Sequence, residues 1–581
     1  MARSQLAKVF KYLRPHWRPL VAGTISLLVV NVLTAYVPRL IGRAVDNLDQ
    51  DFVSNQLMQY VWTIFILASI TLGIRIASRM FIFGIGRSVE ADLKQQIFEH
   101  LLRLSPNYFA NQKVGDLISI ATSDVDNIRR LLGFAILSLI NTAFAYATIL
   151  PFMLAIDVKL TVLAISVYPL MFVVVNVFGT RMRDQQLDVQ EQTGSVSSLL
   201  QEDLNGMALI KTYAQEDNER RAFAGLNQGL LDANLKLAKT RNMLFPFLGG
   251  IASVSSLILL WLGGEMLASA NSGFTVGELI QQITYVNLLI FPTALLGFTI
   301  TTFQRGVVSI DRVESILSTK PEIADAADAI SLKVPSCKGK IEAQNLTYTY
   351  PGSDNPALDR VNFVINSGET VAIIGPVGSG KSTLANALPR LLDIDANQLF
   401  IDGNDITKIK IADLRSIITY VPQDSFLFST TMRENIRYGE PTADEPTVDY
   451  YAGQARIKNE ILNFPRQYET IVGERGITLS GGQRQRTALS RALLVDSPIL
   501  LLDDALSSVD NKTATEILAN LPATKTVIFI SHQLSAAANA DRLIVLDRGK
   551  IISIGTHQEL LQSCQLYLKL WNQHKLEEVL K

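Results

Sequence analysis

The residues best suited to chemistry lie in one stretch near the carboxyl terminus, residues 479–510, with the sequence LSGGQRQRTALSRALLVDSPILLLDDALSSVD. Further along this stretch, the apolar run 499–502 ends on Asp503 and Asp504. Because α/β proteins place their chemistry at the carboxyl ends of buried parallel strands, the run predicts a strand that carries a Mg²⁺-binding carboxylate. Two glycines near the start let the backbone approach a phosphate, which the positive end of the following helix also favours. The predicted phosphate-contacting residues are Ser480, Gly481, Gly482 and Gln483.

A second glycine-rich loop follows the apolar segment 370–374 and precedes a helix-like run. Strand, glycine loop and helix, in this order, are the context that a phosphate-binding loop requires. Its backbone N–H groups are expected to wrap the phosphates, Lys381 to reach the β- and γ-phosphates, and the Ser382 hydroxyl to ligate Mg²⁺. The predicted nucleotide-binding residues of the loop are Gly375, Pro376, Val377, Gly378, Ser379, Gly380, Lys381, Ser382 and Thr383.

Together these motifs resemble those of the ABC-transporter ATPases, in which LSGGQ precedes a strand that ends in a Mg²⁺-binding Asp. The resemblance extends over essentially the whole chain and is to the bacterial multidrug and lipid exporters. It implies that the chain binds ATP and Mg²⁺ and hydrolyses ATP to drive transport. One position departs from the family pattern: the family has Glu after the Mg²⁺-binding Asp, whereas this chain has Asp504.

The resemblance also assigns roles to residues outside the two glycine-rich motifs. Gln423 in YVPQD would contact Mg²⁺ and the attacking water, with Asp503 and Ser382 as the other metal ligands. The catalytic residues it implies are Asp504, His532 and Gln423. Asp510 corresponds to the segment that crosses to a partner subunit.

Two of the assigned residues also have simpler interpretations. Tyr350, just before Pro351, would stack on adenine, although a tyrosine at a strand end can simply be a core residue. His532 follows the β-branched segment 526–530 and would sense the γ-phosphate, although isolated histidines are usually structural.

The composition suits a membrane protein and argues against a nucleic-acid partner. Charged residues make up 18% of the 581 residues and hydrophobic residues 48%. Lys and Arg number 53 against 54 Asp and Glu, so the chain lacks the basic field that nucleic-acid binding requires. The only two cysteines, Cys337 and Cys564, have no metal-ligand spacing and are expected to be unpaired cytosolic thiols.

Six apolar segments in the first half predict membrane helices. The segment 60–74 is the shortest and continues through Arg75 and Arg79, which either snorkel to the interface or contact the substrate or another helix. The basic N-terminus and the long, basic loops after spans 2 and 4 predict that these parts are cytoplasmic. The segments are 20–37, 60–74, 131–156, 160–180, 243–264 and 279–304.

The two long loops are expected to be helical extensions that turn back near residues 107–116 and 213–221. Apolar residues recur every four positions in both loops, for example Val89, Leu93 and Ile97. In the exporters that the chain resembles, the corresponding turns are coupling helices that dock on the ATPase domains. A solvated turn between two helices is the alternative that the residues alone leave open.

The predicted architecture is an all-α membrane domain of six transmembrane helices with long cytoplasmic extensions, followed by an α/β P-loop ATPase domain with a helical subdomain. The expected boundaries are 1–317 for the membrane domain, 318–339 for a linker and 340–581 for the ATPase domain. The chain would lie in the cytoplasmic membrane, with its N-terminus and ATPase domain in the cytoplasm.

The predicted function is ATP-driven export of a hydrophobic or amphipathic compound (a drug, lipid or peptide) by a half-transporter that pairs with a second one. Asp504 favours a heterodimer in which this chain provides the slow ATP site. A homodimer with weak ATPase activity, an ATP-gated channel or regulator, and an importer remain alternatives.

Overall fold

The computed structural model describes residues 2–50, 54–269, 273–507, 509, 511–522, 524–531 and 533–580. The chain forms two compact units. The first comprises Met1–Leu102 and Gln112–Thr319, and the second comprises Arg103–Asn111 and Lys320–Lys581. Each unit has its own hydrophobic core.

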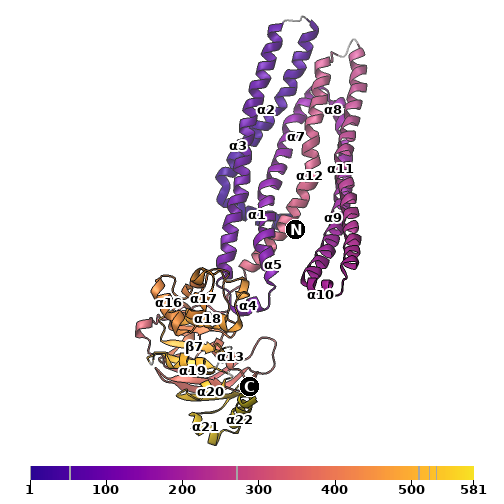
Figure 1. Cartoon of the computed structure of the whole chain (residues 1–581). Coiled ribbons are helices and arrows are strands. Elements are labelled where there is room, and N and C mark those ends of the chain that lie inside the picture. Colours follow the sequence, from indigo (N-terminus) through magenta and orange to yellow (C-terminus); the bar gives the residue numbers. More distant parts are fainter. Residues whose placement is uncertain are drawn as a thin grey trace. The chain divides into compact units, whose positions relative to one another are not determined.

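The first unit consists of helices (Figure 1). Among the described residues, six helical stretches are long and apolar enough to cross a membrane, which confirms the predicted number of spans. These stretches are Ala7–Asn47, Gln56–Leu101, Val114–Ile156, Val158–Asn205, Glu216–Ala268 and Val276–Leu317. The longest single helix, α11 (Glu216–Ala268), has 53 residues. At 1.5 Å per residue it extends about 80 Å, far beyond the roughly 30 Å hydrocarbon layer, which agrees with the predicted helical extensions of the long loops.

The remaining helices of this unit include both long and short elements. The first, second, fourth and sixth spans are built mainly from α2 (Trp17–Gln50), α3 (Ser54–Leu101), α9 (Tyr168–Asn205) and α12 (Val276–Leu317). The third span is composite, because π-helical turns interrupt it twice: its segments are α5 (Val114–Ser119), η2 (Ile120–Asp124), α6 (Val125–Arg130), η3 (Leu131–Ala135) and α7 (Ile136–Ile156). The short elements are α1 (Ala2–Leu13), η1 (Arg14–His16), α8 (Val158–Ile165) and α10 (Met207–Thr212).

Hydrogen bonds between helices accompany the apolar packing of the membrane unit. Asn31 on α2 donates to Asn141 on α7 at 3.1 Å. The Tyr168 hydroxyl on α9 donates to the carbonyl of Val286 on α12 at 2.7 Å. In a bilayer, where burial of apolar surface does not drive helix association, contacts of this kind help to hold the helices together. Arg75 on α3 lies 3.4 Å from the Thr34 hydroxyl on α2, a contact between two helices, and its snorkelling to the interface stays a prediction.

The two predicted turns of the long loops differ in detail from the expectation. The first contains the short helix α4 (Pro106–Ala110), and its segment Arg103–Asn111 belongs to the second unit, where the Ser105 hydroxyl donates to Glu322 at 2.9 Å. The second turn begins earlier than predicted, at Gly206, and α11 already starts at Glu216. Docking of the turns as coupling helices stays a prediction.

The second unit contains a six-stranded sheet of order β10-β9-β3-β8-β7-β6, in which all neighbours are parallel except β10 and β9. Every residue of β7 and β8 is buried, as expected for strands covered on both faces. Because parallel strands end at the same edge, the loops after β3, β7 and β8 converge there. The strands are β3 (Thr370–Ile374), β6 (Ile418–Val421), β7 (Ile499–Asp503), β8 (Thr526–Ile530), β9 (Arg542–Asp547) and β10 (Lys550–Gly555).

An antiparallel sheet and several helices complete this unit (Figure 1). The sheet has the order β2-β1-β4-β5, with β1 (Ile341–Tyr348), β2 (Leu358–Ile365), β4 (Leu399–Ile401) and β5 (Asn404–Asp405). The helical subdomain, predicted for residues of about 425–494, holds α15 (Met432–Arg437), α16 (Glu445–Gln454), α17 (Lys458–Asn463) and α18 (Gly481–Leu494). The other helices are α13 (Lys381–Ala387), α14 (Ile411–Ile417), α19 (Asn511–Ala519), α20 (Leu534–Ala537), α21 (His557–Ser563) and α22 (Gln565–Leu580). The predicted fold class is confirmed.

Candidate nucleotide-binding site

The loop between β3 and α13 has the backbone shape of a phosphate cradle. Gly378 and Gly380 adopt positive φ angles of 79° and 101°, a region that other residues rarely enter. A Cβ on Gly380 would also lie only 2.5 Å from the Ala357 carbonyl oxygen. These constraints explain why the loop needs glycine there, and the exposed loop leaves backbone N–H groups for an anion.

Lys381, the first residue of α13, supplies a cation to this loop. Its side chain is only 7% exposed, and its ammonium donates to the carbonyls of Gly375 and Pro376 at 2.9 and 2.8 Å. Burial lowers the pKa of Lys381, while Asp503 and Asp504 act in the opposite direction. A buried cation beside two carboxylates is suited to meet the negative phosphates of a nucleotide.

Ser382 and Asp503 bring a hydroxyl and a carboxylate together at the end of β7. The Ser382 hydroxyl lies 3.2 Å from Asp503 Oδ1, and Asp503 is 2% exposed. Burial raises the pKa of Asp503, and the nearby Asp504 raises it further, so a cation at this position would restore the charged form. Within the described part of the chain no group of three or more His, Cys, Asp or Glu residues could hold a metal ion. Two oxygen ligands plus phosphate and water oxygens suit Mg²⁺, which keeps much of its hydration shell.

A cavity of about 360 Å³ joins most of the predicted site residues. Tyr350, Gln423, Asp503 and Asp504 line it together with the loop residues Val377, Gly378, Ser379, Gly380, Lys381, Ser382 and Thr383. Tyr350 is 39% exposed, and its hydroxyl lies 3.3 Å from the Thr383 hydroxyl, so its ring is partly accessible at the cavity. The side chains therefore converge from β1, β3, β6 and β7, as the motif order predicts.

Asp504 lies at the inner wall of this cavity in an unusual conformation. Its φ angle is +51°, its backbone N–H donates to the Ile530 carbonyl at 3.0 Å, and its side chain is 8% exposed. Asp is one of the few residues with a side chain that tolerates the left-handed region. The carboxylate next to the Mg²⁺-binding position is thus carried by a hydrogen-bonded turn in the left-handed region.

Not all predicted residues meet in the cavity. Among the described residues that line it, none belongs to the signature Ser480–Gln483, and Gly375 and Pro376 are not among them either. Ser480 caps α18 by accepting from the Gln483 N–H, and Gln483 bonds back to the Ser480 N–H. Asp510 and His532 lie outside the described residues. One chain therefore holds a phosphate loop and a signature that do not share a cavity.

Four residues at the site were missed by the sequence reasoning. The Tyr420 hydroxyl lies 3.4 Å from Asp503 Oδ2, and Ala357 and Ile530 line the cavity. Gln485 on α18 contacts the carbonyl of Asp504. Tyr420 stands three residues before Gln423 at the end of a strand, and that position was the only available signal. Gln485 had none, because its partners, the Asp504 carbonyl and the Ser507 hydroxyl, lie in a turn about twenty residues away.

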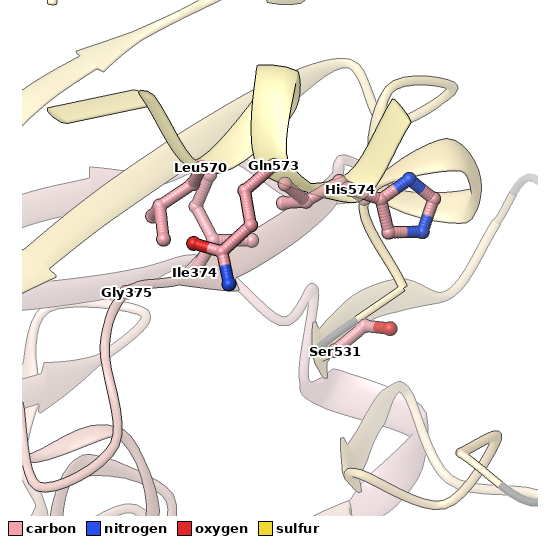
Figure 2. Close-up of a pocket in the computed structure, with 7 residues that line it drawn as sticks. Ile374, Gly375, Ser531, Leu570, Gln573 and His574 are labelled. Carbon is pink, nitrogen blue, oxygen red and sulfur yellow. The ribbon is translucent and has the colours of Figure 1, made fainter. Parts of the chain in front are cut away.

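A second cavity of about 200 Å³ lies beside the start of the phosphate loop. Figure 2 shows Leu570, Gln573 and His574 on α22 next to Ile374, Gly375 and Ser531, at the ends of β3 and β8. Ser531 directly precedes the predicted γ-phosphate sensor His532. The carboxyl-terminal helix thus packs against the edge of the sheet that carries the predicted chemistry.

Comparison with known proteins identifies both parts of the chain. Residues 20–293 match the family model described as ABC transporter transmembrane region, and residues 358–507 match the one described as ABC transporter. The chain is 32% identical to the probable multidrug resistance ABC transporter ATP-binding/permease protein YheI of Bacillus subtilis, over 99% of this chain and 98% of that protein. It is also 32% identical to the ATP-dependent lipid A-core flippase of Syntrophus aciditrophicus, over 98% and 94% of the two chains.

A solved structure shows the same architecture. The structure of a bacterial Atm1-family ABC exporter with ATP bound has a TM-score of 0.77 and 26% sequence identity, and the match covers 96% of this chain and 99% of that chain. The predictions of an ATPase with ATP and Mg²⁺ as cofactors, and of a multi-pass inner-membrane protein with a cytoplasmic ATPase domain, are confirmed. The chain belongs to the ABC transporter family, as a half-transporter of the multidrug and lipid exporter type that joins one membrane domain to one ATPase domain and acts as a dimer.

Proposed function

We propose that this chain is one half of a heterodimeric exporter and contributes its slow ATP site. The observation that carries the proposal is Asp504, which lines the nucleotide cavity where the family has Glu. In the family, that Glu holds and polarises the water that attacks the γ-phosphate. Asp has similar acidity, but its side chain is one methylene shorter, which withdraws the carboxylate by roughly 1 to 1.5 Å. A misplacement of about 1 Å can slow a reaction by on the order of 10²-fold.

The surroundings of Asp504 oppose a compensating shift. The residue sits at φ +51°, bonded through its N–H to Ile530 and through its carbonyl to Ser507. A backbone held on both sides cannot move the shorter carboxylate outward without breaking these bonds. ATP bound at this site is therefore expected to remain for long periods and to hold the dimer closed.

The intact signature supports a partner with a competent site. Ser480 to Gln483 keep the family pattern, and Ser480 and Gly481 are exposed at the start of α18. In the family's head-to-tail arrangement, the signature of one chain completes the ATP site of the other. If the productive site is the one on the partner's phosphate loop, this chain needs an intact signature but not a full-length catalytic carboxylate, and this is the combination that its sequence has.

The remaining roles at the site are part of the same proposal. Tyr350 stacks on adenine, residues 375–383 bind the phosphates, and Ser382, Gln423 and Asp503 contact Mg²⁺. His532 contacts the γ-phosphate and Asp510 the partner subunit. The domain boundaries 1–317, 318–339 and 340–581 are proposed with them.

The proposed substrate is hydrophobic or amphipathic. Relatives of the chain are named as multidrug transporters and as a lipid A-core flippase. Two of the contacts between described membrane helices, Asn31–Asn141 and Tyr146–Thr293, join neutral amides or hydroxyls. Neutral groups among apolar helices suit a lipid-soluble compound better than an ion.

The heterodimer can be tested by expressing two copies of this chain, with different affinity tags, in the native host. Purification through one tag should recover a different half-transporter, one with Glu at the position equivalent to Asp504, and little of the other tag. The control for non-specific recovery is the same purification from cells that express only one tagged copy of the chain. Efficient recovery of both tags in one complex, with brisk ATPase activity, would establish the homodimer instead.

A further inference from the structure

Gln485 links the signature helix to the segment that carries Asp504. It lies on α18, five residues after Ser480, and its side chain is only 9% exposed. Its amide nitrogen lies 2.9 Å from the Ser507 hydroxyl and 3.3 Å from the Asp504 carbonyl oxygen. A glutamine one turn inside the helix thus bonds the backbone of the predicted catalytic residue.

The bonded segment is a compact turn. The Ser507 N–H and hydroxyl both donate to the Asp504 carbonyl, at 3.2 and 3.0 Å. On the other side, the Gln533 amide nitrogen donates to the Val509 carbonyl at 2.9 Å. The turn after β7 is therefore tied both to α18 and to the chain that leaves β8.

The Asp504 carbonyl does not depend on Gln485 for hydrogen bonding, because Ser507 satisfies it twice. The Gln485 contact is therefore not needed to pair that buried acceptor. Its geometric effect is to fix the distance between α18 and the turn. Because Asp504 is held in the left-handed region at φ +51°, a small shift of this turn would re-aim its carboxylate.

We propose that Gln485 is a positioning residue that transmits engagement of this chain's signature to the backbone at Asp504. The proposal rests on the head-to-tail dimer of the proposed function, in which the start of α18 meets ATP held by the partner subunit. When that ATP fixes Ser480 to Gly482 at the start of α18, Gln485 on the same helix fixes the turn at Asp504 and Ser507. Occupancy of one ATP site thereby sets the geometry of the carboxylate in the other.

Hydrogen–deuterium exchange of the purified full-length transporter tests this inference. Exchange is measured with and without ATP in EDTA, which prevents hydrolysis, in peptides that cover residues 504–509 and residues 375–383. In the wild type, ATP should slow exchange in both peptides. In Gln485→Ala, the protection of 504–509 should be lost, with exchange about tenfold faster than in the ATP-bound wild type, while residues 375–383 remain protected.

Three further variants show whether the lost protection reflects the positioning role of Gln485 or a general loss of folding. Gln485→Glu keeps the shape of the side chain but cannot donate from an ionised carboxylate, so it should behave like Gln485→Ala. Gly482→Asp, which blocks the signature, should also remove the protection of 504–509. Gln558→Ala makes the same chemical change at an exposed position of α21 and should behave like the wild type.

The inference fails if Gln485→Ala or Gln485→Glu retains the wild-type protection of 504–509, or if ATP does not protect this segment in the wild type. It also fails if Gly482→Asp leaves that protection intact. The choice between heterodimer and homodimer is judged separately by the two-tag purification. Either assembly places the signature against ATP on another subunit, so a homodimer would refute the slow-site proposal without touching the role of Gln485.

Discussion

Replacing Asp504 by Glu should raise the turnover of this chain's own ATP site. The added methylene extends the carboxylate by roughly 1 to 1.5 Å into the cavity that Lys381 and Ser382 also line. If the reach of the side chain limits the rate, restoring it should recover a large part of the about 10²-fold loss expected for such a displacement. The gain should therefore lie between about 10-fold and 100-fold.

The variant also carries a structural cost. Asp504 has a φ angle of +51°, and Glu enters the left-handed region less readily than Asp, at a cost of about 1 kcal/mol. The melting temperature should therefore fall by a few degrees, without loss of folding.

The assay is steady-state ATP hydrolysis by the purified complex, in a background in which the partner subunit's catalytic Glu is replaced by Gln. The measured hydrolysis then comes only from the ATP site that contains Asp504. Asp504→Asn and Asp504→Ala are the matched controls, and neither should exceed the wild-type rate. A folded, ATP-binding Asp504→Glu complex with no gain in rate would refute the argument that side-chain length makes this site slow.

Two further predictions concern residues around the site and near the start of the ATPase domain. Tyr350→Ala should raise the ATP dissociation constant, measured by ATP titration, by on the order of 10-fold, because stacking on an aromatic ring contributes about 1–3 kcal/mol. Tyr350→Phe keeps the ring and should change the constant less than about twofold. Equal losses of affinity in both variants would point to the 3.3 Å contact with Thr383 instead of stacking. Burial and the neighbouring Asp402 raise the pKa of Cys337 to about 12, so the rate at which maleimide labels it should rise about tenfold per pH unit from pH 7 to 10. For a cysteine introduced at the exposed Ser353, the labelling rate should level off near pH 8.5. A labelling rate of Cys337 that levels off below pH 10 would contradict the raised pKa.

Much of the nucleotide site was predictable because its chemistry depends on short motifs in a fixed order. A glycine loop after a strand and an Asp at the end of another strand must meet at one sheet edge, and Lys381 and Asp503 do line one cavity. The six membrane spans followed from apolar length alone.

Other features were not predictable, because they depend on contacts that leave no pattern in the chain. The left-handed φ of Asp504 and the bond from Gln485 to its carbonyl involve backbone geometry that no residue type encodes. The two π-helical turns in the third span, Ile120–Asp124 and Leu131–Ala135, differ from an α-helix only in their backbone hydrogen bonding, so the pattern of apolar residues could not locate them. The early start of the second long turn, at Gly206, was missed because the polar residues 216–221, which were assigned to the turn, already belong to α11.

The central claim is that this chain provides a slow ATP site of its own and a competent signature for its partner. It is tested most directly by comparing two variants of this chain in the purified complex, by steady-state ATP hydrolysis. Asp504→Ala should leave most of the activity, because the fast site uses the partner's carboxylate. Gly482→Asp should abolish it, because the fast site needs this chain's signature. Loss of activity in both variants to the same extent would contradict the claim and establish two equivalent sites.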